Sequence, residues 1–261
     1  MDKENKRVWL TKGCSVEYII GSNDESEFFL HDGIELCLSV SGGDKFIISD
    51  KVYDIKPMDL FIIGSYDIHK ETYAKNALYE RYYALFSLEF ISRFSTPKTD
   101  LKRCFADFLK NGSNKIRLSE EQNIQLTRLF NKTLNINAGF GRDLQEQIYL
   151  LEIILYASQM CYDNNFADTD YYAKDNSPII EKLFDYINKN ISEELSLDVL
   201  AQEVHVSKSY MCKVFKKHTG TTINKYIVAR RISEAKRLLK TNDSIAYVCD
   251  KTGFNDYAHF I

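Results

Sequence analysis

Residues 196–220 read SLDVLAQEVHVSKSYMCKVFKKHTG, and this stretch determines the fold expected for the C-terminal part of the chain. Apolar residues from Leu197 to Val204 recur at the positions that share one face of a helix. Ser196 is a suitable N-cap, and His205 is among the few residue types besides glycine that tolerate a left-handed conformation. The sequence therefore predicts a short helix that stops at His205.

A second helix is predicted directly after this turn, with Ser207 as its N-cap and Gly220 as its stop. Its apolar residues Met211, Val214 and Phe215 point one way. The opposite face carries small polar and basic residues, namely Lys208, Ser209, Cys212, Lys213 and Lys216. Two short helices joined by a tight turn form a helix-turn-helix, whose second helix can enter the major groove of DNA.

Positive charge is concentrated in this region. From Lys208 to Lys240 the chain contains ten lysines and arginines and one acid, Glu234. A solvated helix face usually mixes both signs, so the excess favours a surface that contacts phosphates over an ordinary polar surface. The charge is local, because residues from Asn176 onward carry a net charge of +3 and the residues before it carry −6.

A second unit of the same kind follows at an offset of 48 residues. Ile245, Val248 and Cys249 repeat the apolar positions of the first helix, and Gly253 takes the place of the histidine at the first turn. A longer helix over residues 222–240 is expected to join the two units rigidly. Two such units on one connecting helix can address successive major grooves, which lie roughly 34 Å apart.

The C-terminal part resembles the DNA-binding domain of AraC/XylS-type transcription regulators. The residues that carry the resemblance are Ala201, Ser207, Phe215-Lys216-Lys217, Gly220, Tyr226, Arg230, Ala235, Leu238-Leu239, Ile245 and Gly253-Phe254. The resemblance covers residues 178–261 densely, and it implies sequence-specific binding to double-stranded DNA through two helix-turn-helix units.

Carried over to this chain, the resemblance assigns individual side chains to DNA. The groove-facing residues are expected to be Ser209, Cys212 and Lys213 in the first unit, with Lys208 beside them, and Tyr257, Ala258 and His259 in the second. Contacts to phosphates, or in part support of the fold, are expected from Lys216, Lys217, Arg230, Arg231 and Arg237. The family continues beyond the counterpart of Ile261, so the second unit is expected to be truncated in this sequence.

The composition is ordinary for a soluble globular protein, with 44% hydrophobic and 27% charged residues. A length of 261 residues is sufficient for two domains. The six cysteines form no CxxC pair and have no metal-ligand spacing, which indicates a reduced, cytoplasmic protein. The N-terminus leads into no apolar signal core, and no apolar run approaches the ~18 residues of a membrane span, so no membrane association is expected.

The N-terminal part is predicted to be rich in strands. Short apolar, β-branched and aromatic runs lie at residues 16–20, 34–40, 45–49, 51–55, 60–63 and 78–88, separated by Gly, Asn, Asp and Ser. This spacing favours a small sandwich or barrel. The order His31 to Glu35, Tyr53 to Leu60 and His69 is similar to the cupin-like sensor domain of many AraC-type regulators, although Pro57-Met58-Asp59 stands where Pro-Gly-Asp is frequent. The expected fold class is α+β: a cupin-like barrel or sandwich with appended helices, followed by an all-α domain.

Candidate ligand-binding residues lie on these strands. His31, Glu35 and His69 are suitable ligands for a transition metal, but enzymatic cupins generally need a third histidine, which the first 177 residues lack. We therefore expect no metal and no cofactor. A small-molecule effector, for which a sugar is one candidate, is expected to contact these three residues and the aromatic side chains Tyr53, Phe61, Tyr82 and Phe86. The open alternative is that the histidines are ordinary strand-end residues and the aromatic side chains form core.

After Pro97 the pattern becomes helical. Leu144, Ile148, Leu151 and Leu155 follow one another at a coiled-coil-like spacing. The resemblance implies that helices here form a homodimer, and packing of the same helices on their own barrel is the alternative. The expected domains are a sensor and dimerisation domain at 1–162, a polar linker at 163–177, and a DNA-binding domain at 178–261 that opens with Pro178 in its first helix.

The sequence as a whole predicts a DNA-binding transcription regulator that a small-molecule effector controls, and not an enzyme. Its expected partners are double-stranded DNA, the effector, a second copy of the chain and, as a further candidate, RNA polymerase. Two alternatives remain open. One is a cupin-type metal enzyme with an accessory DNA-binding tail, and the other is a dimerising antagonist that cannot grip DNA.

Overall fold

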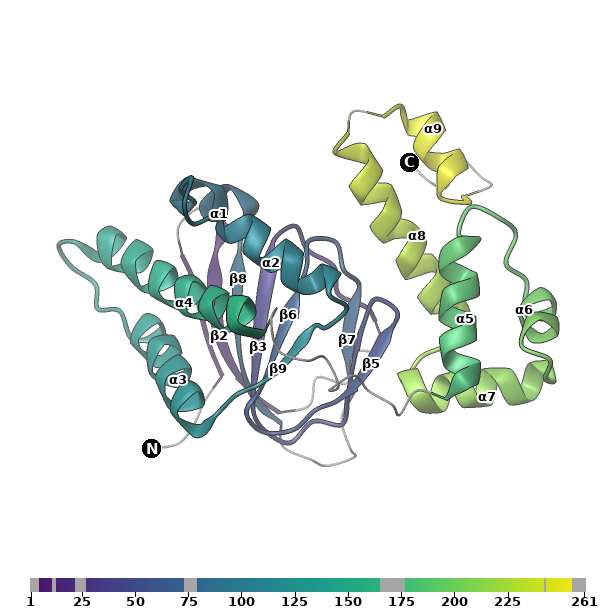
Figure 1. The fold of residues 1–261 in the computed structure, drawn as a ribbon, viewed down its shortest axis with the longest axis horizontal. Helices are drawn as coiled ribbons and strands as arrows, with labels where there is room; N and C mark the ends of the chain where they lie inside the picture. Colours follow the sequence, from purple (N-terminus) through teal and green to yellow (C-terminus); the bar gives the residue numbers. More distant parts are fainter. Residues whose placement is uncertain are drawn as a thin grey trace.

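The structure is a computed structural model that describes residues 5–10, 13–21, 27–72, 79–164, 177–241 and 243–254. A region of antiparallel strands and the helices that follow it precede an all-helical region at the C-terminus (Figure 1). The mixed fold class expected from the sequence is therefore confirmed.

In the part of the chain that the structure describes, the strands form two antiparallel sheets. The larger sheet has six strands in the order β1-β2-β8-β3-β6-β9, and the smaller has three in the order β5-β4-β7. The strands are β1 Lys6–Trp9, β2 Ser15–Ile20, β3 Ile34–Ser41, β4 Lys45–Ile48, β5 Lys51–Asp54, β6 Asp59–Ile63, β7 His69–Glu71, β8 Glu80–Phe86 and β9 Lys115–Arg117.

Side chains along the strands alternate between separate cores, because successive strand residues point to opposite faces. In β3, Leu36 and Leu38 belong to one core, whereas Cys37 between them belongs to another. Phe61 and Ile63 of β6 join Cys37 in this second core, together with residues of β4 and β5. The second core therefore lies between the two sheets, and β6 is buried along its whole length.

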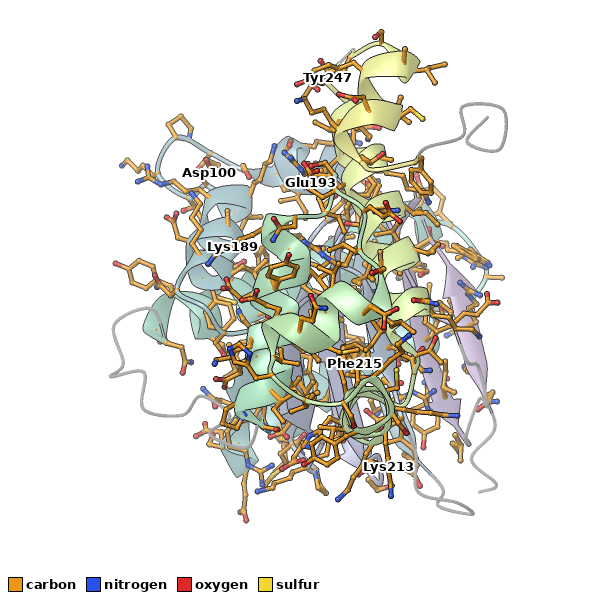
Figure 2. All side chains as sticks on the ribbon, turned by 90° about the vertical axis from the view of Figure 1, so that its right-hand side faces the viewer. Asp100, Lys189, Glu193, Lys213, Phe215 and Tyr247 are labelled. Atoms are coloured by element: carbon orange, nitrogen blue, oxygen red, sulfur yellow. The ribbon has the colours of Figure 1, made fainter. Side chains whose placement is uncertain are left out.

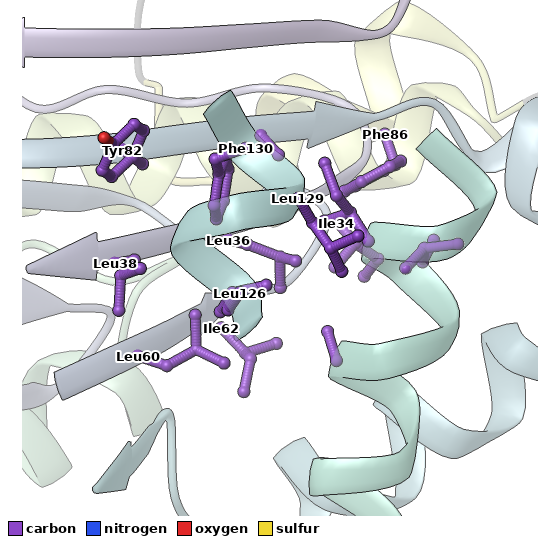
Figure 3. Close-up of a cluster of buried hydrophobic side chains, with 14 of the residues drawn as sticks. Ile34, Leu36, Leu38, Leu60, Ile62, Tyr82, Phe86, Leu126, Leu129 and Phe130 are labelled. Carbon is purple, nitrogen blue, oxygen red and sulfur yellow. The ribbon is translucent and has the colours of Figure 1, made fainter. Parts of the chain in front are cut away.

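Helices cover the other face of the larger sheet. They are α1 Leu88–Phe94, α2 Leu101–Lys110, α3 Glu120–Leu134 and α4 Arg142–Asn164. Leu126 and Phe130 of α3 lie against Leu36 and Tyr82 of the sheet (Figure 3). The rings of Tyr82 and Phe130 are stacked, with their centroids 5.1 Å apart. The apolar faces of these helices are thus buried against the sheet of their own domain.

The C-terminal region is built of short helices with hydroxyl caps. The helices are α5 Pro178–Lys189, α6 Leu197–Glu203, α7 Lys208–Thr219, α8 Ile223–Leu239 and α9 Ile245–Lys251. The side chains of Ser196, Ser207, Thr222 and Ser244 each accept a hydrogen bond from the backbone N–H three residues further on. As predicted, α5 opens with Pro178, and α8 connects the first helix pair to α9.

These helices pack directly on the outer face of the smaller sheet. Ile47 of β4, Val52 of β5 and Ile68 share one core with the buried side chains of α5 to α8. A hydrogen bond of 2.6 Å from Ser233 Oγ to the carbonyl oxygen of Tyr66 adds a polar contact. The molecule is consequently layered: α1 to α4, the larger sheet, the smaller sheet, and then the helical domain (Figure 1).

Several local features were not predicted. The strands β1, β7 and β9 have four, three and three residues, too few for a periodic pattern to stand out. Met58 adopts a left-handed conformation, with φ of 67°, in the turn where glycine is frequent in similar domains. Within the ranges described, no helix has both the length and the apolar character that crossing a bilayer requires. All six cysteines lie in these ranges and are free thiols.

Candidate functional site

The first helix pair is joined by the turn that its sequence predicts. His205 has φ of 55°, so the chain turns in the left-handed conformation directly after α6. The N–H of Val206 donates to the carbonyl oxygen of Ala201 over 3.1 Å, which closes the end of the helix. Ser207 then caps α7. The turn thereby fixes the direction in which α7 leaves α6.

Helix α7 has one buried face and one exposed face. Met211 and Phe215 are fully buried and anchor the helix, whereas Lys213, Lys216 and Lys217 are exposed. Figure 2 shows Phe215 inside the helical domain and Lys213 at its surface. Because the buried residues lie on the opposite side of the helix, the ammonium groups of the three lysines are accessible to a polyanion.

The N-terminal end of α7 carries the remaining residues predicted to contact DNA in the first unit. Lys208 and Ser209 are exposed, and Cys212 is half-buried. Lys208 Nζ forms an ion pair with Asp198 of α6, 2.7 Å from its Oδ1 atom. Both side chains are largely exposed, so this pair competes only weakly with a phosphate for the lysine.

The arginines of α8 are engaged within the protein. Arg231 donates to the carbonyl oxygens of Ile191 and Glu193 over 3.1 and 2.7 Å. Arg230 Nε donates to the Asn188 side chain over 3.0 Å. Arg237 forms an ion pair with Glu234 one helical turn away. All three arginines are predicted to contact phosphates or, in part, to support the fold. The contacts favour fold support for Arg230 and most clearly for Arg231, whereas Arg237 is exposed and remains accessible to a phosphate.

The second unit begins in the same way as the first. Ser244 caps α9, and Gly253 has φ of 69°, matching the left-handed turn at His205. The N–H of Phe254 donates to the carbonyl oxygen of Cys249 over 3.2 Å, as Val206 does in the first unit. Tyr257, Ala258 and His259, which the sequence analysis assigns to the groove, lie outside the described residues.

A cavity of about 390 Å³ lies in the N-terminal domain. It is lined by Arg7, Ser15, Glu17, Ile19, Phe29, Leu30, His31, Glu35, His69, Lys70, Glu71, Arg81, Tyr83 and Leu85. The lining residues of β2 and β8 alternate along each strand, so they share one face of the larger sheet. This is the inner face, next to the smaller sheet.

Three of the predicted effector-binding residues meet in this cavity. His31 Nε2 lies 3.2 Å from Glu35 Oε2, and His69 Nε2 lies 3.5 Å from Glu35 Oε1. Burial raises the pKa of the Glu35 carboxyl, but the two histidines outweigh this effect and hold the pKa below its ordinary value. Burial lowers the pKa of the His69 imidazole. These shifts favour an ionised carboxylate beside a neutral imidazole.

The four aromatic residues predicted to contact the effector do not line this cavity. Tyr53 and Phe61 are buried in the core between the sheets, and the Tyr53 hydroxyl is hydrogen-bonded to Asn114. Tyr82 and Phe86 point to the opposite face of the larger sheet, into the core beneath α1 to α4 (Figure 3). This corrects the expected pocket lining. Both faces of these strands are covered, and at these four positions the covering layer leaves no cavity.

Two charged cavity residues, Glu17 and Arg81, were not predicted from the sequence. Glu17 of β2 lies between Val16 and Tyr18, and Arg81 of β8 follows Glu80 and precedes the largely apolar and aromatic run 82–86. Arg81 is buried and pairs with Glu71 of β7 over 3.0 Å. A charge at an inward position of a strand is costly unless it is paired, and this signal could have located the cavity.

The predicted dimerisation residues lie on α4. Leu144, Ile148 and Leu155 are 60%, 53% and 41% exposed, whereas Leu151 is half-buried against the core of its own domain. An apolar face therefore remains uncovered on this helix in the single chain.

Comparisons with known proteins identify one family model and several similar proteins. A family model described as a helix-turn-helix domain matches residues 200–261. The transcriptional activator RhaR of Mannheimia succiniciproducens is 25% identical over 237 residues, which cover 88% of this chain and 79% of RhaR. The multiple antibiotic resistance protein MarA of Escherichia coli is 33% identical over 76 residues, which cover 29% of this chain and 60% of MarA. A crystal structure of ToxT from Vibrio cholerae aligns over 95% of this chain and 90% of that chain, with 14% identity and a TM-score of 0.38.

Proposed function

We propose that the chain is a DNA-binding transcription regulator of the AraC family, in which α7 reads the operator while a small molecule in the N-terminal cavity controls this binding. The observation that carries the first part is the exposure of Lys213, Lys216 and Lys217 on a helix whose opposite face is anchored by buried Met211 and Phe215. Such a helix can enter a major groove without any rearrangement of its domain.

The roles of the α7 side chains follow from their positions. Ser209, Cys212 and Lys213 contact base edges, and a lysine there donates to acceptors such as guanine O6 and N7. Lys216 and Lys217 contact phosphates on either side of the groove. Arg230 and Arg231 of α8 stabilise the domain that carries α7. The second unit, including Tyr257, Ala258 and His259, adds contacts in the next major groove.

Control by a small molecule is supported by residues that belong to both the cavity and the contact between the domains. Lys70 lines the cavity, and its Nζ donates to the carbonyl oxygen of Gly220 at the end of α7 over 3.3 Å. His31 lines the cavity, and the adjacent Asp32 forms an ion pair with Lys240. A ligand that binds one arrangement of these residues better than another shifts the helical domain accordingly. The charged lining suits a polar effector such as a sugar.

The exposed apolar face of α4 supports a homodimer. Leu144, Ile148 and Leu155 would be covered by the same helix of a second copy, as in a coiled-coil seam. A dimer presents two α7 helices, and thus binds a site with two halves. RNA polymerase is a further proposed partner. Cytoplasmic location and the absence of enzymatic activity complete the proposal.

Fluorescence anisotropy with the full chain and DNA from upstream of its own gene tests the proposal. We expect at least about tenfold tighter binding to this DNA than to a scrambled duplex of the same length at physiological salt. The same titration, repeated with metabolites that raise the melting temperature of the chain, measures control. Equal affinity for both duplexes would contradict operator reading, and unchanged affinity with every stabilising metabolite would contradict effector control.

A further inference from the structure

Three side chains of different strands and loops converge at one end of the cavity. His31 precedes β3, Glu35 lies within β3, and His69 begins β7 of the other sheet. One nitrogen of each histidine and a carboxylate oxygen of Glu35 all lie within 4.8 Å of one another. The fold thus brings His69 next to His31 and Glu35, which lie more than 30 positions earlier in the chain.

Two atoms of this group have no hydrogen-bond partner. Glu35 Oε1 and His31 Nδ1 are buried and have no such partner among the residues that the structure describes. Leaving buried polar atoms unsatisfied is costly, so most proteins avoid it. A bound ligand that accepts lone pairs would remove this cost.

A neighbouring group in the same cavity differs in this respect. Glu71 accepts hydrogen bonds from Tyr79 and Tyr83 over 3.1 and 2.6 Å, and it pairs with Arg81 over 3.0 Å. This cluster satisfies itself within the protein. Glu71 therefore has a structural role. Glu35 and the two histidines form the group that is available to bind a ligand.

A hydrogen bond at Nδ1 fixes the orientation of the His69 ring. Its Nδ1 lies 3.0 Å from the carbonyl oxygen of Asp67, which is the distance of a hydrogen bond with the ring N–H as donor. A carbonyl oxygen can only accept, so this bond favours the tautomer with its proton on Nδ1 and leaves Nε2, on the Glu35 side of the ring, for a ligand. Histidines that bind metals are held in this way by an acceptor at the other ring nitrogen.

Against the expectation from the sequence, we propose that His31, Glu35 and His69 bind a divalent transition metal ion at the contact between the two sheets. Imidazole and carboxylate are the ligands that Zn²⁺ and its neighbours in the first transition row accept. Three protein ligands leave coordination positions open toward the cavity. These positions take water or the donor atoms of a small molecule that occupies the cavity.

A cobalt titration of the full chain tests this site. The protein is first stripped with EDTA, and Co²⁺ is then added while visible absorption is recorded and binding is measured by calorimetry. We expect one Co²⁺ ion to bind per chain and to give d–d absorption bands. Added Zn²⁺ should abolish these bands, because it competes for the same ligands. Glu181→Gln is the control, since Glu181 is an exposed carboxylate of α5 outside the cavity and the variant is expected to bind Co²⁺ as the wild type does.

His69→Ala and Glu35→Gln are expected to weaken Co²⁺ binding by more than about a hundredfold, because even residues behind a metal ligand cost about 10–100-fold. His31→Gln provides a third variant at a less buried position, with folding of each variant checked by circular dichroism. Failure to bind Co²⁺, or equal binding by these variants, would show that the three residues only pair with one another. The anisotropy of metal-free protein with DNA is independent of this result, so the site and the proposed DNA-reading function can fail separately.

Discussion

Ile47 and Ile48 are consecutive, fully buried residues of β4 that belong to different cores. Ile47 packs with the C-terminal helices, whereas Ile48 packs between the two sheets. The alternation of side chains along a strand thus makes the smaller sheet a shared wall. One of its faces stabilises the N-terminal domain, and the other holds the helical domain in place.

Replacing Ile47 by Ala is therefore expected to loosen the contact between the domains. The cavity left by such a change costs about 2–5 kcal/mol, and here the loss falls on the contact with α5 to α8. Hydrogen-exchange mass spectrometry should show faster exchange in these helices. Ile48→Ala, with a cost of the same order, should instead accelerate exchange in β6 and β3. Identical exchange maps for the two variants would contradict this division of the cores.

The Tyr226 hydroxyl is buried within the helical core and has no hydrogen-bond partner in the described part of the chain. Tyr226→Phe is therefore expected to raise the free energy of unfolding by about 1 kcal/mol, because it removes an unsatisfied polar group. Tyr53→Phe is the matched comparison. It should lower stability by about 1–3 kcal/mol, since Tyr53 bonds to Asn114. Urea unfolding curves measure both, and destabilisation by Tyr226→Phe would count against this environment.

The left-handed turn at His205 sets the angle between α6 and α7. His205→Val should destabilise the protein by about 1–2 kcal/mol, because a β-branched residue fits this conformation poorly. His205→Asn should leave stability nearly unchanged, since asparagine tolerates positive φ. Thermal unfolding of both variants is the measurement, and equal melting temperatures for them would be inconsistent with a strained turn.

Lys213 and Lys217 should differ in how they contribute to DNA binding. Lys213→Ala is expected to reduce the preference for operator over random DNA by roughly 1–3 kcal/mol, because a base contact is lost. Lys217→Ala should weaken binding to both duplexes alike and reduce the salt dependence, because a phosphate contact is lost. Anisotropy titrations at several salt concentrations separate these effects. A uniform loss for Lys213→Ala would place that lysine on the phosphate backbone.

The C-terminal region could be predicted from the sequence almost helix by helix. Its signals are local: hydroxyl caps, apolar spacing within a few residues, and turn positions such as His205 and Gly253. The role of Arg231 could not be predicted, because its acceptors lie about 40 positions away in the chain. Only the folded domain brings them to the guanidinium group.

The N-terminal site was predicted less completely. His31, Glu35 and His69 were identified by residue type, and the structure brings them together. The aromatic residues were misplaced because strand periodicity states which side chains share a face, but not whether a cavity or another layer covers that face. Phe61 and Tyr82 illustrate this limit, since each lies on a covered face.

The shared wall formed by the smaller sheet has a practical consequence for dissecting the protein. Separating the chain near Ser177 would leave Ile47, Val52 and Ile68 facing water, and such a fragment is expected to self-associate or precipitate. Ligand screening on an isolated sensor fragment would then detect binding to an apolar surface that is buried in the intact molecule. Detergent-sensitive aggregation of residues 1–176, set against monodisperse behaviour of the whole chain, would reveal how far each half depends on the other for solubility.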